Sequence, residues 1–403
     1  MKTILEINTT NYASTGNIML NIAKLARNEG FKAYTASKIS KEGKKHSCDN
    51  HIFIGFWLDR VISEELAYIT GLRGYFNIIN TKIFLKQIDK IKPDLIHLHV
   101  LHDSFINLNM LFKYINLHNI PVIWTFHDCE AFTGECPYFD LVSCNKWKNG
   151  CNHCPQTKIV PKSLLFDTTE LIWNKKKKLF TSVSNMRIVT CSKWLADLTK
   201  ESFFKKYDIK VLNNGINLSV FKPTDSDFRD RYKLQNKYII LGVSNRWSYR
   251  KGLDVFISLA KKLDENYQIV LVGTNDKIDK TLPSNIISIH RTYNQEDLAK
   301  IYSSADLFVN PTREENFPTV NIESIACGTP VLTYNTGGSP EIIDEKSGFV
   351  VEKNDFNNLY KEIIRICENK PYSDQDCISR SKKFDMNNIF KGYVDLYKEV
   401  LAK

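Results

Sequence analysis

Two acidic side chains, Glu315 and Glu323, lie eight positions apart in the stretch PTREENFPTVNIESIACG. The apolar run before Glu315 is typical of a buried strand and the residues after it of a helix, so Glu315 would stand at a strand end and Glu323 near the second helical turn. At 1.5 Å per residue the carboxylates would be roughly 12 Å apart. Two carboxylates that act on one glycosidic bond lie about 5 to 10 Å apart. The spacing therefore favours contacts with two separate hydroxyl-bearing groups of one extended ligand.

The start of this helix could add a second kind of contact. Asn316 is a residue type that caps helices, and Pro318 is favoured at the first helical position. A helix start presents unpaired backbone N–H groups, which can hold an anion or the hydroxyls of a sugar.

Arg246 and Lys251 occupy the loop SNRWSYRKGLD, which follows another apolar run. The loop leads into an amphipathic stretch, so two cations and a helix dipole would meet at the N-terminus of a helix. Together they could hold a diphosphate. The apolar runs before this loop and before Glu315 would be strands of one parallel sheet. The two cations and the two carboxylates should therefore meet at the carboxyl edge of that sheet.

Histidines occur in the first half of the chain. His97 and His99 alternate within the run DLIHLHV and would share one strand face, where a metal pair and ordinary strand histidines are both open interpretations. His127 follows the run IPVIWTF, at a strand end where a functional and a structural histidine are the alternatives.

Four of the ten cysteines are concentrated in the stretch CPYFDLVSCNKWKNGCNHC. The spacing C-x7-C-x6-C-x2-C contains one close pair, typical of a zinc-binding turn, and two cysteines at wider spacing. Cys129 and His153 are reserve ligands. Three interpretations are open: a structural zinc site, buried free thiols, and a disulfide or redox pair. The cysteines concerned are Cys136, Cys144, Cys151 and Cys154.

The elements that must position these residues alternate along the chain. Apolar runs at KTILEIN, FKAYTAS, DLIHLHV and IPVIWTFHD are separated by amphipathic stretches, and the pattern restarts with YIILGVS, YQIVLVGT, DLFVNP and PVLTYN. Strands that alternate with helices predict parallel sheets with right-handed crossovers. Since the strands are almost continuously apolar, both faces of each sheet should be covered. We therefore expect an α/β fold with two doubly wound, Rossmann-like domains.

The restart of the pattern places a first domain at residues 1–216 and a second at 217–385. An amphipathic helix at 386–403 is expected to pack back on the first domain, and 129–161 is expected to be a Cys-rich insertion. In doubly wound sheets ligands bind beyond the carboxyl ends of the strands, so the expected site is a cleft between two facing domains.

The composition, 43% hydrophobic and 25% charged residues, is that of an ordinary globular chain. The N-terminus lacks the apolar core of a signal peptide, and no stretch reaches the roughly 18 apolar residues of a membrane span, which predicts a cytoplasmic protein. Residues 1–212 hold 29 basic and 19 acidic side chains, whereas the remainder holds 26 of each. This asymmetry favours an anionic partner for the first half. A nucleic acid is not expected, because no recognition helix or aromatic platform accompanies the basic residues.

Taken together, these stretches resemble the retaining glycosyltransferases of family 4, of the bacterial surface-polysaccharide type, which adopt the two-domain GT-B fold. The resemblance rests on Glu315 and Glu323 followed by ACGTPVL and GGSPE. It extends over nearly the whole chain through TTNYASTGN, TFHD, NNGINLSVFKP, RWSYRKG and NQEDLAKIYSSADLFVNP.

The resemblance implies roles for individual residues. Glu315 and His127 would contact the transferred sugar, and Glu323 would hold the ribose hydroxyls. Arg246 and Lys251 would neutralise the diphosphate. The donor-binding residues implied are Thr15, Gly16, Arg246, Lys251, Arg291, Tyr293, Phe317, Thr319 and Glu323.

The activity implied is transfer of a sugar from a UDP- or GDP-sugar to a glycan or lipid-linked glycan, with retention of the anomeric configuration and no cofactor required for catalysis. Zinc, if bound, would be structural. The basic first domain suggests an enzyme that associates peripherally with the anionic inner face of a membrane. A nucleotide-sugar epimerase and a phosphorylase of the same fold are the alternatives, although no motif for a phosphorylase cofactor lysine is recognisable.

Overall fold

The computed structural model describes residues 1–158 and 163–402, and the chain divides into two compact units. The first unit holds residues 1–212 together with the C-terminal stretch from Phe390, and the second holds Asn213–Ile389. The division falls four residues before the expected boundary and within the last helix. The ends of the expected insertion and of the expected C-terminal helix, 159–161 and 403, lie outside the described residues.

The first unit is built on a seven-stranded parallel sheet with the strand order β3-β2-β1-β4-β5-β6-β7. Every residue of β1, β4 and β5 is buried, as expected for strands covered on both faces. The strands are β1 (Thr3–Ile7), β2 (Lys32–Lys38), β3 (His51–Ile54), β4 (Leu95–Leu98), β5 (Val122–Phe126), β6 (Met186–Thr190) and β7 (Asp208–Val211).

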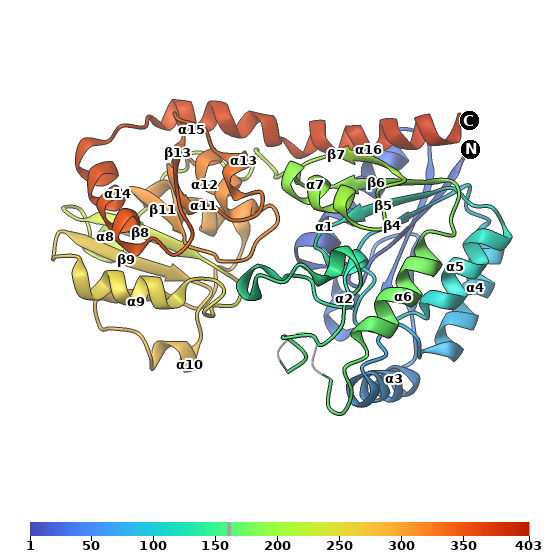
Figure 1. The fold of residues 1–403 in the computed structure, drawn as a ribbon. Coiled ribbons are helices and arrows are strands. Elements are labelled where there is room, and N and C mark those ends of the chain that lie inside the picture. The colour runs from blue at the N-terminus through green and yellow to red at the C-terminus, as the bar shows by residue number, and fades with distance from the viewer. Residues whose placement is uncertain (159–162, 403) are drawn as a thin grey trace. The chain divides into compact units, whose positions relative to one another are not determined.

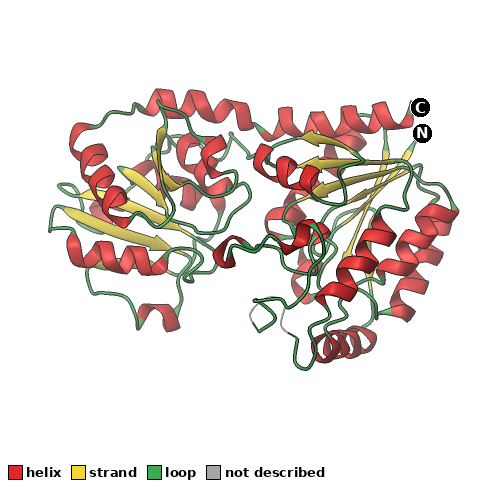
Figure 2. Cartoon of the chain, in the orientation of Figure 1, coloured by secondary structure: helices red, strands yellow, loops and turns green. Residues whose placement is uncertain are grey.

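Helices cover both faces of this sheet (Figures 1 and 2). They are α1 (Ala13–Asn28), α2 (Lys41–Lys45), α3 (Trp57–Thr70), α4 (Ile78–Ile91), α5 (Leu108–Leu117), α6 (Thr169–Phe180) and α7 (Lys193–Glu201). Most of the last helix, α16 (Met386–Leu401), also belongs to this unit, and its Tyr393, Val394 and Tyr397 are buried there.

The second unit has a six-stranded parallel sheet in the order β10-β9-β8-β11-β12-β13. Its strands are β8 (Tyr238–Val243), β9 (Tyr267–Val272), β10 (Ile286–Ile289), β11 (Leu307–Asn310), β12 (Val331–Tyr334) and β13 (Gly348–Val351). Its helices are α8 (Phe228–Arg231), α9 (Leu253–Lys262), α10 (Asp276–Asp279), α11 (Gln295–Ser304), α12 (Thr319–Ala326), α13 (Ser339–Ile342), α14 (Phe356–Asn369) and α15 (Asp374–Ser381). Apolar residues of the strands and of α9 and α14 form its core, among them Leu271, Val309, Phe256 and Ile363.

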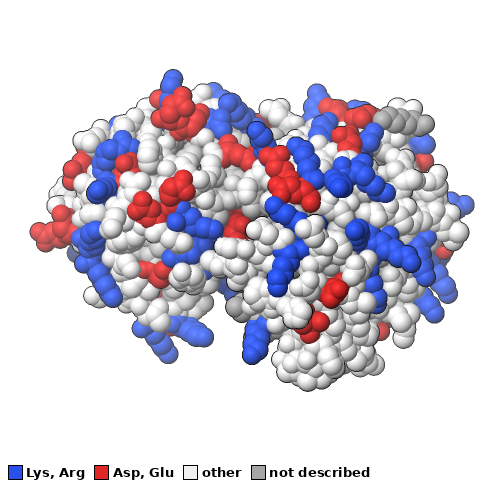
Figure 3. Space-filling view, in the orientation of Figure 1, with Lys and Arg blue, Asp and Glu red and all other residues white. Residues whose placement is uncertain are grey.

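Both sheets confirm the predicted α/β fold with two Rossmann-like units. Among the helices of the described residues, none combines the length and the apolar character that crossing a bilayer requires. Figure 3 shows Lys and Arg side chains spread over the visible face of the first unit, in line with the excess of basic residues in its sequence.

Candidate active site

Glu315 and Lys251 form an ion pair at the carboxyl edge of the second sheet. They come from the loops after β11 and β8, which are neighbouring parallel strands, so both loops leave the sheet at the same edge. The side chains are only 14% and 18% exposed, and the Nζ of Lys251 donates to Oε2 of Glu315. The structure thus brings together two residues that are 64 positions apart, one a carboxylate suited to sugar hydroxyls and one a cation suited to phosphate.

Arg313 holds these two loops against each other. Its guanidinium donates to both carboxylate oxygens of Asp254 at 2.8 Å, to the amide oxygen of Asn354 at 2.7 Å and to the carbonyl oxygen of Tyr249. It also stacks on the Tyr249 ring, with the guanidinium carbon 3.9 Å from the ring centroid. The backbone N–H of Arg313 donates to the carbonyl of Arg250 at 2.8 Å. Arg313 therefore fixes the loop that carries Lys251 to the loop that carries Glu315.

The GGSPE stretch packs on the same loop through its glycines. Gly337 has φ +56°, and a Cβ at this position would lie 1.7 Å from the carbonyl oxygen of Glu315. The N–H of Gly338 donates to the carbonyl of Asn316 at 2.7 Å. A side chain at Gly337 would therefore displace the backbone that carries Glu315, which explains the glycine.

Glu323 lies on α12 and is half-buried. The hydroxyl of Tyr302 donates to its Oε2 at 3.2 Å. Burial raises the pKa of Glu323 to about 7, although hydrogen bonds from Tyr302 and Thr319 act in the opposite direction. The carboxyl group is therefore poised to change its charge near neutral pH.

The start of α12 differs from the prediction. The helix begins at Thr319 and its N-cap residue is Pro318, with no side-chain cap, so the expected cap at Asn316 is wrong. The extended backbone of Pro318, with φ −73° and ψ 111°, delays the helix beyond Asn316. Phe317 is buried against the ring of Phe384, and its carbonyl accepts a hydrogen bond from Asn214 at 3.2 Å.

The remaining predicted residues of the second unit are exposed. Arg246 stands in the loop after β8. Arg291 and Tyr293 follow β10, and the Tyr293 side chain is 96% exposed. They lie at the same carboxyl edge as Glu315, because all strands of the sheet are parallel. None of these three is held in place by a side-chain contact as Lys251 is by Glu315, at least among the contacts the structure describes.

In the first unit, Thr15 and Gly16 lie in the first turn of α1, just beyond β1. A Cβ at Gly16 would lie 2.7 Å from the carbonyl carbon of Asn11, so the glycine lets the β1–α1 loop fold back on the helix. The amide of Asn8 donates to the Thr15 hydroxyl at 3.2 Å, and its oxygen accepts from the Val100 N–H at 3.1 Å. Asn8 thus ties the ends of β1 and β4 to this turn.

His127 follows β5 and is joined to a buried chain of polar side chains. Its Nε2 lies 3.1 Å from Nδ1 of His99, and Nε2 of His99 lies 3.1 Å from Oε2 of Glu6. His97 lies beside this chain, with Nδ1 at 2.6 Å from the Tyr397 hydroxyl of α16. The three strands β1, β4 and β5 are adjacent in the sheet, which aligns the side chains in a row.

Burial sets the charge of this row. It lowers the pKa of His127 to about 4 and that of His97 to about 3, and lowers the pKa of His99 well below its ordinary value. Burial likewise raises the pKa of Glu6 well above the ordinary range of a carboxyl group. The imidazole rings of His127, His97 and His99 are therefore uncharged at neutral pH.

His102 is the exception among the nearby histidines. Burial disfavours its protonation, but the Asp128 carboxylate, 2.9 Å from its Nε2, outweighs that effect and raises the pKa of His102 to about 9. Asp128, which follows His127 in the sequence, thus forms a charged pair with His102, whereas His127 itself is neutral.

Two protein-family models together match most of the chain. Residues 39–220 match the model described as Glycosyltransferase Family 4, and residues 224–384 match the model described as Glycosyl transferases group 1. The chain belongs to glycosyltransferase family 4. The division between the two matches falls close to the division between the two structural units.

Curated relatives of this glycosyltransferase include proteins of bacterial polysaccharide synthesis. The putative colanic acid biosynthesis glycosyl transferase WcaC of Escherichia coli K12 is 22% identical over 275 residues, which cover 66% of each chain. A UDP-Gal:alpha-D-GlcNAc-diphosphoundecaprenol alpha-1,3-galactosyltransferase of E. coli is 25% identical over 48% of this chain and 54% of its own. The chain thus spans from about half to about two thirds of the length of these relatives.

Solved structures share the fold over the full length. Sucrose-phosphate synthase from Thermosynechococcus elongatus superposes with a TM-score of 0.73 at 18% identity, covering 100% of both chains. HepE from Anabaena, solved in complex with UDP-glucose, gives a TM-score of 0.69 at 16% identity and covers 99% of this chain and 100% of its own. These likenesses establish the GT-B fold of this glycosyltransferase.

Several residues of the site were not found from the sequence. Arg313 precedes Glu315 by two positions in PTREEN, but nothing in the stretch distinguishes a buried anchor from a surface arginine. Glu6 is a charged residue in the apolar run KTILEIN, and its burial among histidines depends on the strand order. The charge of Glu6 within an otherwise apolar run was the available indication of a row of buried polar side chains.

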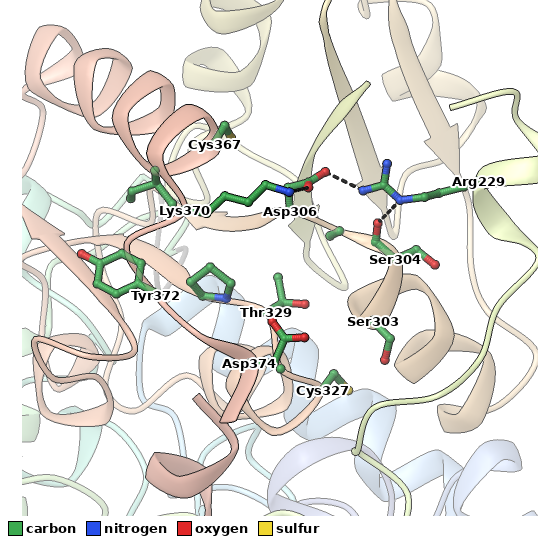
Figure 4. A pocket seen from close by; sticks show the side chains of 14 residues that line it. Arg229, Ser303, Ser304, Asp306, Cys327, Thr329, Cys367, Lys370, Tyr372 and Asp374 are labelled. Carbon is green, nitrogen blue, oxygen red and sulfur yellow. Dashed lines mark hydrogen bonds and ion pairs between the residues drawn. The ribbon is translucent and has the colours of Figure 1, made fainter. Parts of the chain in front are cut away.

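A separate polar cavity of about 230 Å³ lies elsewhere in the second unit (Figure 4). Asp306 and Pro330, which line it, directly precede β11 and β12, so the cavity lies at the amino edge of the sheet, opposite Glu315. Three of its charged residues pair with one another: Arg229 donates to Asp306, and Lys370 lies 4.0 Å from the same carboxylate. It is therefore not part of the candidate active site.

Proposed function

We propose that this glycosyltransferase moves a sugar from a nucleoside-diphosphate sugar to a hydroxyl group of a glycan or lipid-linked glycan in surface polysaccharide synthesis, with retention of the anomeric configuration. The observation that carries the proposal is the Glu315–Lys251 pair at the carboxyl edge of the second sheet, with the half-buried Glu323 on the helix that follows. These three groups match the three parts of such a donor: sugar, diphosphate and ribose.

The proposed reaction requires charge stabilisation and no metal ion. The bond between the anomeric carbon and the diphosphate oxygen breaks with its electron pair on the leaving group, and the acceptor oxygen forms its bond on the same face of the sugar. The acceptor proton passes to the leaving phosphate. Lys251 and the exposed Arg246 would stabilise the negative charge that builds on the diphosphate, and they need not move to do so.

His127 is proposed to contact the sugar as a neutral hydrogen-bonding group. Its Nε2 lies 3.1 Å from Nδ1 of His99, which joins His127 to the row of buried side chains. Because burial lowers the pKa of His127 to about 4, this contact would place no positive charge near the developing oxocarbenium-like centre.

The donor and acceptor can be tested directly. HepE binds UDP-glucose and the E. coli relative is named for a UDP-sugar and a diphosphoundecaprenol acceptor, which supports a UDP-sugar as the first candidate. A panel of UDP- and GDP-sugars should be incubated with the protein, with and without a lipid-diphosphate-linked sugar. Donor consumption that depends on the acceptor supports transfer. Release of free diphosphate without any acceptor would instead favour an epimerase.

Donor affinity is expected to depend on pH through Glu323. A carboxylate accepts two ribose hydroxyls better than a protonated carboxyl group does, and the pKa of Glu323 is about 7. The Kd of the nucleoside diphosphate should therefore rise as pH falls from 8 to 6, by up to tenfold per unit below the pKa. The Kd is measured by isothermal titration calorimetry. The Glu323→Gln variant is the control, because its Kd for the nucleoside diphosphate should be high at every pH. An unchanged pH dependence in the variant would remove Glu323 from the ribose site.

We further propose that the first unit docks on an anionic membrane through α3, α4 and residues 164–166. Apolar side chains at these elements are at least 37% exposed, and the carbonyl of Tyr68 in α3 accepts a hydrogen bond from the Leu164 N–H at 2.9 Å. Exposed Lys82 and Lys86 lie on α4 among them. The apolar residues are Phe56, Leu58, Ile62, Leu66, Ile69, Ile78, Ile79, Ile83, Leu164, Leu165 and Phe166. Apolar side chains beside lysines are typical of surfaces that insert shallowly between anionic headgroups.

This docking is testable by flotation with vesicles. The protein should float with vesicles that contain an anionic phospholipid, less so at 0.5 M salt, because salt screens the lysines. Ile79→Glu should lower the bound fraction, since Ile79 is 61% exposed on α4. Leu117→Glu is the matched control, an 81% exposed leucine on α5. Equal loss of binding in both variants, or equal binding to uncharged vesicles, would contradict the assignment.

A further inference from the structure

The segment between β5 and α6, residues 127–168, is long, and the structure describes all of it except residues 159–162. In its described part it contains three single-turn 3-10 helices: Glu130–Phe132, Asp140–Val142 and Lys146–Lys148. Loops longer than about 15 residues without their own secondary structure need another source of order. Trp147 is one such source: it is 1% exposed and stacks on Phe139, with ring centroids 5.1 Å apart.

The four concentrated cysteines converge on one point of this loop. Cys136, Cys144, Cys151 and Cys154 all line a single cavity, which Trp147 and Gln156 help to close. The cavity holds about 20 Å³, room for one atom or ion and too little for an organic ligand. Cys129 and His153, the reserve ligands suggested by the sequence, do not line it. Of the six candidate ligands, only the four thiols therefore lie around this cavity.

Backbone groups are aimed at two of the sulfur atoms. The N–H of Gly134 donates to Sγ of Cys151 at 3.1 Å, and the N–H of Gln156 donates to Sγ of Cys154 at 3.4 Å. Such N–H donors stabilise a thiolate, which is the form of cysteine that binds metal. Lys146 closes the same turn, because its Nζ donates to the carbonyls of Asn152 and His153, each at 3.0 Å.

The sulfur atoms are grouped more loosely than a bound ion would hold them. No three of the four Sγ atoms, all of them described, lie within 4.8 Å of one another. A tetrahedral zinc site with Zn–S bonds of about 2.3 Å requires sulfur–sulfur distances of about 3.8 Å. Closing this difference requires only side-chain rotation and small shifts of an irregular loop, which is inexpensive compared with moving a strand or helix.

We propose that Cys136, Cys144, Cys151 and Cys154 bind one zinc ion through four thiolates. Each thiol gives up its proton on binding, so one Zn²⁺ replaces four protons, and four sulfur ligands leave no open position for a substrate. The site is therefore structural. All four cysteines are free, and soft thiolate ligands favour zinc over the hard divalent cations.

The bound ion would stabilise the residues that follow His127. The hydroxyl of Thr133 donates to the carbonyl of Cys136 at 2.7 Å, and the N–H of Cys129 donates to the carbonyl of Pro137 at 3.1 Å. Order imposed at Cys136 is thereby passed to Asp128 and its neighbours. This inference concerns the loop alone and stands whether or not the protein transfers a sugar.

Metal analysis tests the site. The full chain, purified without added metal or chelator, should contain about one zinc per molecule by mass spectrometry. Cys151→Ser and Cys154→Ser should lose it, whereas Cys48→Ser, which changes a cysteine of the same unit outside the loop, should keep it. Exchange of the metal for cobalt should give the absorption bands of tetrahedral cobalt thiolate.

Two results would overturn the proposal. One is a metal-free native protein in which the four loop thiols titrate as free thiols or are joined as disulfides. The other is zinc that remains in both serine variants. If a serine variant does not fold, the cobalt spectrum of the unaltered chain decides, since a spectrum without thiolate bands rules out the four-cysteine site.

Discussion

Replacing Glu315 by glutamine should lower the turnover number for sugar transfer about 100- to 1,000-fold, the usual loss when one preorganised electrostatic contact to a transition state is removed. Glutamine keeps the size of the side chain but removes the charge that pairs with Lys251. Because Glu323 and the second sheet are untouched, the Kd of the nucleoside diphosphate should change little. Turnover and Kd should be measured on the same preparation, with circular dichroism to verify the fold.

The control for this variant is Glu345→Gln, the same change at an exposed glutamate of the same unit. Its turnover should equal that of the unaltered protein. Normal turnover in Glu315→Gln would remove Glu315 from the site. A parallel loss of diphosphate binding would instead show that Glu315 acts mainly by holding Lys251 in place.

Replacing Arg313 by alanine should lower the free energy of unfolding of the second unit by about 2–4 kcal/mol, the range for breaking a largely buried ion pair and its hydrogen bonds. We place the value below the full buried-pair cost because Asp254 is 46% exposed and water can replace part of the contact. Turnover should fall about 10- to 100-fold as well, since the loops that carry Lys251 and Glu315 lose their common anchor. Urea denaturation and steady-state kinetics measure the two effects.

Arg231→Ala provides the matched control, because Arg231 forms an exposed ion pair with Asp227 in the same unit. It should change neither stability nor turnover appreciably, as exposed pairs contribute little. Equal stability of Arg313→Ala and Arg231→Ala would show that the network around Arg313 is not an anchor.

The residues at the carboxyl edge of the second sheet could be predicted from local sequence because each of them follows its own strand. Apolar runs marked the ends of β8 and β11, and in a parallel sheet all such ends meet at one edge. The sequence therefore predicted that Lys251 and Glu315 lie at the same edge, and the structure shows them in contact. The helix start was misplaced because Asn316 is a common cap, whereas the extended backbone of Pro318 delays the helix to Thr319.

The polar row of the first unit could not be predicted in the same way. Glu6 and His99 are 93 positions apart, and His97 and Tyr397 are 300 apart. Their contacts require that β1, β4 and β5 be neighbours and that α16 return to the first sheet. Periodicity indicates that a residue faces a sheet surface, but it carries no information on which strands are adjacent.

The sequence by itself determined the α/β class, the two Rossmann-like units, the family and the residues at the carboxyl edge of the second sheet, because these follow from local apolar patterns and short motifs. Only the tertiary structure decided that Arg313 anchors two loops, that His127 stays uncharged beside Glu6 and His99, and that four cysteines, without Cys129 and His153, line one cavity. The physical reason is that burial and pairing are properties of contacts between distant segments. The charge of a histidine or carboxyl group depends on those contacts more than on its neighbours in the chain.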